Sequence, residues 1–277
     1  MIAVELSKLA RSRRTWVTIL LIDALPTLVA VLLAATDVGP RPGAGPAFLS
    51  AVMTDGKLFP LAALAIVLPL FLPLAVAITA GEAIAGEAQQ GTLRYVLVRP
   101  VGRTRLLVAK LISVMAFVVL TIVVVAATAY VTGALLLGDG KVPGAAAGAA
   151  GATSVSGSGL TTPELVVRTL MALAYAMFCM IGVAAIALFL STVVRSPLAA
   201  ALGTMGFLIA STLLLTLDAA DSFRGYLPTR YWLAFVDLFR DPIFWRDLVR
   251  GVLLQGAYVV VFLAAAWANF ATKDVTD

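Results

Sequence analysis

Residues 165–217 read LVVRTLMALAYAMFCMIGVAAIALFLSTVVRSPLAAALGTMGFLIASTLLLTL. Two long apolar runs, 165–190 and 198–217, are separated by a short polar link that contains Arg195. A helix needs about 20 apolar residues to cross a hydrocarbon core about 30 Å thick. Both runs meet that length, and they must be helices because lipid cannot satisfy open backbone groups. This stretch therefore predicts two membrane spans joined by a tight turn.

Four more runs of this kind lie on either side, at 16–35, 58–80, 111–137 and 248–270. An alternative for the third run is a helix that starts near Thr104, as a cytoplasmic extension of the span. Of the 277 residues, 61% are hydrophobic and only 13% are charged. Soluble domains are closer to half apolar and a quarter charged, so a soluble core could not hide this much apolar surface. We predict an all-α membrane protein with six transmembrane helices, forming a single domain over residues 1–277.

The second span should be bent. Pro69 and Pro73 lie four residues apart within it, so their missing backbone donors share one face of the helix. Membrane helices tolerate such breaks where neighbouring groups satisfy the backbone.

The lysines and arginines indicate the orientation. Of the 20, 11 lie on the side that holds the N-terminal segment and the connection between spans two and three, and 9 lie on the other side. The short, basic segments predict that this side is the cytoplasm, with both chain ends there, in the plasma or inner membrane of a bacterium. The basic residues form no single patch, so the net charge of +5 does not indicate nucleic-acid binding.

The first 14 residues predict an amphipathic helix at the membrane interface. Ile2, Leu6 and Leu9 follow helical spacing, with charged residues on another face. The alternative is a signal peptide, but the apolar run that follows is longer than an ordinary signal sequence carries.

Three segments on the other side have distinct compositions. Residues 138–160 are rich in Gly, Ala and Ser and predict a flexible loop, after which Thr161 to Glu164 predict a helix start. The aromatic-rich segment 218–247 predicts one or two short helices at the outer interface. The alternative for 218–247 is an ordered loop packed on the bundle.

The connection between spans two and three carries the clearest functional pattern. Residues 81–110 read GEAIAGEAQQGTLRYVLVRPVGRTRLLVAK, with a polar segment, a Gly-Thr break, a second apolar face and a Pro turn. Such a compact element, joined directly to two membrane helices, could carry force from a partner to the bundle. The alternative is a basic loop that only orients the spans.

The same residues resemble a motif of the ABC type-2 exporter permeases, from Glu87 through Gly91-Thr92 and Pro100-Val101 to Lys110, with Gly102 where that family commonly has Ser. The resemblance implies a transmembrane permease subunit that works as a dimer with a second, identical or homologous subunit. It implies ABC ATPase partners that supply ATP and Mg, so the chain itself is not an enzyme and holds no cofactor. By this resemblance, the coupling helix and its ATPase contacts comprise Glu82, Glu87, Gly91, Thr92, Leu93, Arg94, Arg99, Pro100 and Arg103.

Other chemistry finds little support in the sequence. The chain has no histidine and a single cysteine, Cys179, and its only Gly-Lys pair, Gly140-Lys141, lacks the other residues of a nucleotide-binding P-loop. Met177, Cys179 and Met180 could attract a soft metal, but packing explains them better, so we predict no metal site.

Asp23 lies within the first span, where a carboxylate is costly. It could line a transport pathway, or it could be hydrogen-bonded to a neighbouring helix. Two functional alternatives to the permease also remain at this point. One is a secondary transporter or channel, and the other is a non-transporting membrane anchor of an ATPase.

Overall fold

The computed structural model describes residues 2–36, 56–89, 103–137, 152–154, 156, 158–218 and 221–272. Within these residues, six helices are long and apolar enough to cross a membrane. They are α2 (Arg13–Thr36), α5 (Phe71–Gln89), α7 (Arg103–Thr132), α8 (Thr162–Val193), α9 (Pro197–Thr216) and α10 (Trp245–Thr272). The prediction of six apolar spans in a multi-pass membrane protein is confirmed at this level.

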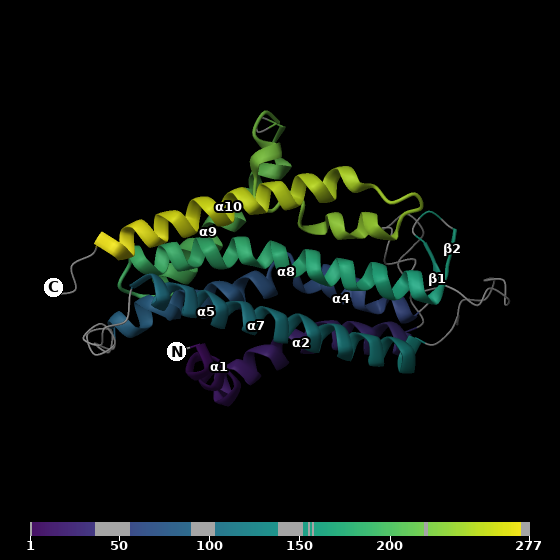
Figure 1. Cartoon of the computed structure of the whole chain (residues 1–277). Coiled ribbons are helices and arrows are strands. Elements are labelled where there is room, and N and C mark those ends of the chain that lie inside the picture. Colours follow the sequence, from purple (N-terminus) through teal and green to yellow (C-terminus); the bar gives the residue numbers. More distant parts are fainter. Residues whose placement is uncertain are drawn as a thin grey trace.

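The elongated bundle has both termini toward the same end (Figure 1). At that end Ile84, Leu106 and Phe270 form a small buried cluster that joins the last turns of α5 and α10 to the first turn of α7. The indole Nε1 of Trp267 donates to the Thr104 hydroxyl at 2.9 Å. The opposite end carries a small antiparallel pair of strands, β1 (Ala152–Thr153) and β2 (Gly159–Leu160). We did not predict these strands in the Gly-rich loop 138–160, and residues 138–151 lie outside the described residues.

The second span, which its prolines predict to be bent, is interrupted. A short 3₁₀ turn, η1 (Gly56–Leu58), leads into α4 (Phe59–Val67), which ends before α5 begins at Phe71. Leu68 is the last residue with a helical hydrogen bond from its N–H, to Leu64 at 2.8 Å, and it directly precedes Pro69. Leu68 itself keeps α-helical backbone angles. Pro69 has no backbone N–H to donate to the preceding turn, so the helical hydrogen bonds stop there, which accounts for the break. The span predicted at 58–80 is therefore two helices, and the second extends nine residues further, to Gln89.

The third span begins before residue 111, close to the alternative start near Thr104, because α7 begins at Arg103. Its last turn changes to a π-helix, η2 (Gly133–Leu137), which packs against η1. A side chain at Gly133 would overlap the backbone oxygen of Gly56 and would lie 2.7 Å from the Cβ of Phe59. The close approach of η1 to η2 therefore requires glycine at this position.

The predicted helix start at Thr161 is confirmed. Glu164 accepts hydrogen bonds from the backbone N–H of Thr161 at 2.9 Å and from its hydroxyl at 2.8 Å. Pro163 occupies the first turn, where its missing N–H has no cost. These contacts set the beginning of α8, which packs extensively against both α5 and α10.

The aromatic segment before α10 forms two short 3₁₀ helices, η4 (Arg224–Tyr226) and η5 (Trp232–Phe239). Short helices were predicted here, but the apolar face of η5 does not lie at an outer surface. Trp232, Phe235 and Phe239 are buried against the bundle, which corresponds to the alternative of a packed segment. The Arg168 guanidinium donates to the backbone oxygens of Leu238 and Arg240 at 3.0 and 2.9 Å, so it anchors the end of η5 to α8.

The predicted amphipathic N-terminal helix is present as α1 (Ile2–Arg11). The chain breaks at Ser12, and the Trp16 indole donates to the backbone oxygen of Ala10 at 2.8 Å across that break. Leu9 packs on the main core, and α1 lies against α7. The break turns α1 away from the direction of α2, so that its charged residues meet the ends of two other helices.

Candidate functional site

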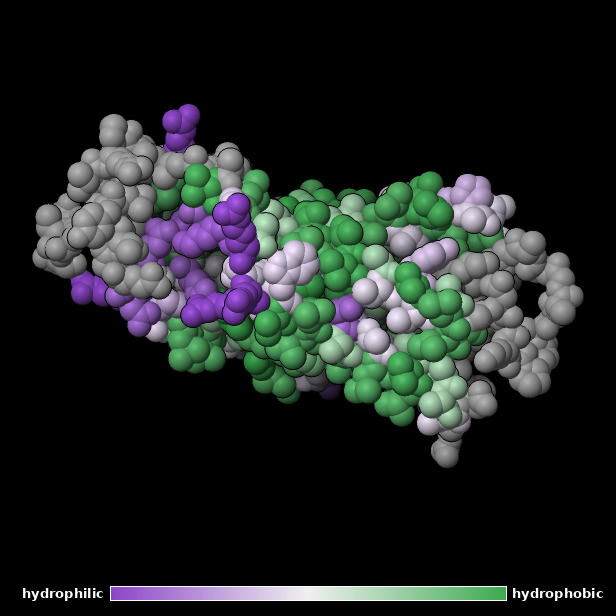
Figure 2. Space-filling view, turned by 90° about the horizontal axis from the view of Figure 1, so that it is seen from below, coloured by the Kyte–Doolittle hydropathy of each residue, from purple (hydrophilic) through white to green (hydrophobic). Residues whose placement is uncertain are grey.

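The charged end of the bundle contains a pocket of about 580 Å³. It lies between α1, the start of α2, the end of α5 and the beginning of α7, and the first residue of α9 also reaches it. Figure 2 shows a hollow ringed by hydrophilic residues beside a broad hydrophobic band. Its lining is Glu5, Lys8, Leu9, Ser12, Arg14, Thr15, Thr79, Glu82, Ala83, Gly86, Glu87, Gln89, Lys110, Ser113, Val114 and Pro197.

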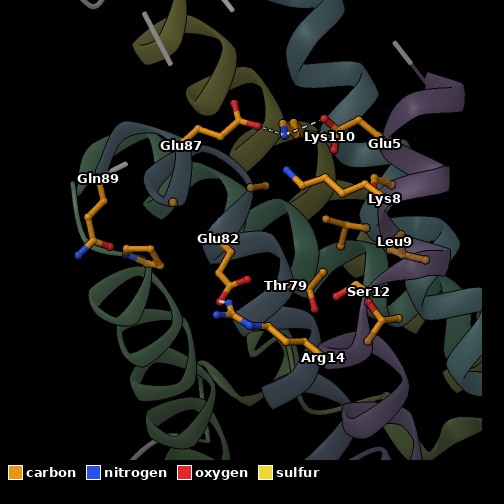
Figure 3. A pocket seen from close by; sticks show the side chains of 16 residues that line it. Glu5, Lys8, Leu9, Ser12, Arg14, Thr79, Glu82, Glu87, Gln89 and Lys110 are labelled. Atoms are coloured by element: carbon orange, nitrogen blue, oxygen red, sulfur yellow. Dashed lines mark hydrogen bonds and ion pairs between the residues drawn. The ribbon is translucent and has the colours of Figure 1, made fainter. Parts of the chain in front are cut away.

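A buried ion cluster forms one wall of this pocket. The Lys110 ammonium from α7 donates to Glu5 of α1 at 3.0 Å and to Glu87 of α5 (Figure 3). The Lys110 side chain is only 5% exposed, and the two carboxylates are 20% and 15% exposed. A buried ammonium must be compensated by opposite charge, so these contacts depend on one another. The cluster therefore joins three separate helices at one point.

The opposite wall is more open. Arg14 of α2 and Glu82 of α5 approach at 3.6 Å, but their side chains are 86% and 49% exposed. Exposed pairs of this kind contribute about 0–1 kcal/mol, so solvent or a ligand can separate them easily. Lys8 extends from α1 into the pocket between the two walls (Figure 3). It makes no ion pair with any side chain in the described part of the chain.

Behind the pocket, the Ser191 hydroxyl of α8 is inserted against the backbone of α5. It donates to the Gly81 oxygen at 2.8 Å and accepts from the N–H groups of Ala85 and Ile84 at 2.9 and 3.2 Å. In a regular helix the N–H of Ala85 donates to the backbone oxygen of Gly81. The Ser191 hydroxyl therefore contacts both the donor and the acceptor of one helical hydrogen bond of α5. Ser191 therefore fixes the α5 segment that carries Glu82 and Glu87.

Removing this hydroxyl should loosen the pocket. We expect Ser191→Ala to lower stability by about 1–3 kcal/mol, because buried backbone groups lose a partner. The thermal unfolding midpoint of the purified protein in detergent measures this cost. Thr216→Ala is the control, since the Thr216 hydroxyl bonds only within its own helix, at an exposed position. Equal midpoints for the two variants would contradict the role assigned to Ser191.

The family comparison covers most of the chain. Residues 44–276 match the model of a family described as protein of unknown function (DUF2705). The chain belongs to this family. No curated protein matches the chain.

This match corrects the resemblance to ABC type-2 exporter permeases, because the family that matches is DUF2705 and not an ABC transporter family. The resembling motif covers only residues 87–110, and its parts have a simpler explanation. A Gly-Thr break, a Pro turn and several arginines are ordinary features of a short basic connection between two membrane helices. Assignment to the permease family from these residues was wrong.

The residues predicted to contact an ATPase are only partly described in this DUF2705 protein. Glu82 and Glu87 line the pocket, and Glu87 is directed inward to Lys110. Arg103 begins α7. The other predicted contacts, Gly91, Thr92, Leu93, Arg94, Arg99 and Pro100, lie outside the described residues. The docking role of all nine therefore stays a prediction.

Sequence reasoning missed Lys8 and Ser191 as parts of the site and gave Lys110 no role. Lys8 belongs to the charged face of the predicted amphipathic helix, and that prediction does not show what the face meets. Ser191 follows an apolar run, and no sequence signal indicated that its hydroxyl would contact α5. Of these three residues, only Lys110 could have been recognised from the sequence, because a lysine beside an apolar run needs a nearby carboxylate.

Asp23 lies outside this pocket, in the α2 span. It is 9% exposed and is hydrogen-bonded to the hydroxyl of Thr128 on α7. The same hydroxyl lies 2.9 Å from the backbone oxygen of Val124. Asp23 thus has the interhelical hydrogen bond that was one of its two predicted explanations, and a role in a transport pathway stays a prediction. Within the described residues, no group of three or more potential metal ligands is present.

Proposed function

We propose that this DUF2705 protein is the membrane subunit of a transport complex and that a separate, soluble ATPase binds its charged end. The observation that carries the proposal is the Lys110 cluster, which ties α1, α5 and α7 together. Residues 90–102 connect the end of α5, the helix that carries Glu87, to the beginning of α7, the helix that carries Lys110. A partner that moves this connection would therefore act on three helices at once. The proposed partner, and not this chain, supplies ATP hydrolysis, because the chain has no P-loop sequence.

The experiment is purification of the tagged chain from its native membrane, followed by measurement of ATP hydrolysis. We expect the wild-type complex to hydrolyse ATP, and Arg94→Glu to reduce the copurified activity by about tenfold, equivalent to about 1.4 kcal/mol of binding energy. Lys141→Glu makes the same charge change in the chain segment between η2 and β1, far from Arg94 in the sequence, so it serves as the matched control. It should leave the activity unchanged.

Asp23 favours a second candidate, a transporter coupled to an ion gradient. A buried carboxylate within a membrane span is a common feature of such proteins. This candidate predicts that no ATP hydrolysis accompanies the purified complex and that Arg94→Glu has no effect. That outcome would contradict the ATPase proposal.

A further inference from the structure

The pocket opens on the side of the bundle, next to a broad hydrophobic surface of the kind that faces lipid chains in membrane proteins. In Figure 2 the bundle is viewed from the side, and the hollow lies beside the hydrophobic band. The α2 residues that follow the pocket include Leu20 and Leu21, which are 63% and 69% exposed. A molecule in this pocket can therefore place a polar group inside while its apolar part lies along α2. Phospholipids have this form and are the most abundant such molecules at the interface.

The charges in the pocket indicate which headgroup fits. Its lining has three cationic side chains, Lys8, Arg14 and Lys110, and three glutamates, Glu5, Glu82 and Glu87, so the formal charge is balanced. Lys110 is already compensated by Glu5 and Glu87. The groups available to a ligand are Lys8, which makes no ion pair within the described residues, and the loose Arg14–Glu82 pair. They offer positive charge beside one half-exposed carboxylate.

From this arrangement we infer that the pocket binds the headgroup of an ethanolamine phospholipid. Its phosphate lies between Lys8 and Arg14, and its ammonium donates to Glu82. A phosphate with no amine would leave Glu82 without a cation when Arg14 turns to the ligand. A choline headgroup has no N–H to donate to Glu82. Four hydroxyl side chains of the lining, from Ser12, Thr15, Thr79 and Ser113, complete a polar surface of the right kind.

This inference does not rest on the ATPase proposal. Lipid binding is a property of the chain alone, so it can be measured without any soluble partner. If the lipid experiment fails, the ATPase proposal still stands. If no ATP hydrolysis copurifies with the chain, the lipid inference still stands.

The test uses the full chain, purified and incorporated into nanodiscs of equal parts ethanolamine and glycerol phospholipid, with retained lipid identified by native mass spectrometry. We expect the wild type to retain ethanolamine phospholipid in excess. Lys8→Gln should reduce that retention about tenfold, because a charge-assisted bond to phosphate is worth about 1.5–3 kcal/mol. Glu82→Gln should keep the total lipid but abolish the preference over glycerol phospholipid.

Two controls separate binding from folding and from surface charge. Arg11→Gln removes an exposed charge of α1 that does not line the pocket, and it should match the wild type. Lys8→Arg keeps the charge and should also retain ethanolamine phospholipid, a result that a merely structural effect of substitution at this position would not give.

Equal retention by Lys8→Gln and the wild type would overturn the inference. It would also fail if soluble phosphoethanolamine, at the same concentration as the lipid, displaced the lipid completely. The pocket would then bind a soluble headgroup compound and not a membrane lipid.

Discussion

Lys110→Met should destabilise the protein by about 3–5 kcal/mol, the range measured when one partner of a buried charge cluster is removed. Methionine is close to lysine in length, so the lost packing is small and the effect comes from charge. Without the ammonium, Glu5 and Glu87 remain close together with side chains only 20% and 15% exposed. Two adjacent carboxylates with little solvent repel each other and lose their shared donor.

Thermal unfolding in detergent measures this effect, with Arg105→Met as the matched control. Arg105 lies on the same helix, five residues earlier, and is exposed. We expect a clear loss of stability for Lys110→Met and almost none for Arg105→Met. The triple variant Lys110→Met, Glu5→Gln, Glu87→Gln should recover most of the loss, because it removes the uncompensated charge. If the two single variants unfold at the same temperature, the cluster does not hold the three helices together.

The spans could be predicted from the sequence because each depends on a local property. The apolar runs gave the number of spans, Pro69 gave the place of the break, and Thr161 to Glu164 gave the start of α8. In each case the physical cause acts within a few residues. Boundaries were less accurate where a helix continues into polar sequence, as α5 does to Gln89. Hydropathy places the end of a span where the apolar run stops, although the helix itself continues.

The site could not be predicted in the same way, because its contacts join residues far apart in the chain. Glu5 and Lys110 are separated by 105 positions and meet only because the break at Ser12 turns α1 onto α7. The sequence indicated Glu87 only as a contact of a partner, and it carried no signal that the packing of α5 brings this side chain to Lys110. The sequence indicated which charged residues lie at this end, and only the packing of the helices determines which of them meet.

The same packing explains a second large effect, at the interface between α8 and α10. A Cβ on Gly251 would overlap the Tyr175 hydroxyl and lie 2.9 Å from the Cβ of Tyr231. That hydroxyl donates to the backbone oxygen of Tyr231 at 2.7 Å, in a buried position. Any side chain at residue 251 must therefore displace Tyr175 and break this bond. Gly251→Leu should cost about 3–5 kcal/mol, from overpacking and from an unsatisfied buried carbonyl together.

Gly256→Leu is the matched control for this prediction, because nothing lies within 4 Å of a Cβ built at Gly256 on the same helix. We expect it to unfold close to the wild-type temperature, whereas Gly251→Leu unfolds well below it. The cause can be isolated with the smaller substitution Gly251→Ala, tested alone and together with Tyr175→Phe. The phenylalanine lacks the hydroxyl that a Cβ would overlap, so the two changes should cost less together than the sum of their separate costs. If the stability costs of the two substitutions simply add, the Tyr175 hydroxyl is not the group that requires glycine at residue 251. Other contacts between α8 and α10 would then impose that requirement.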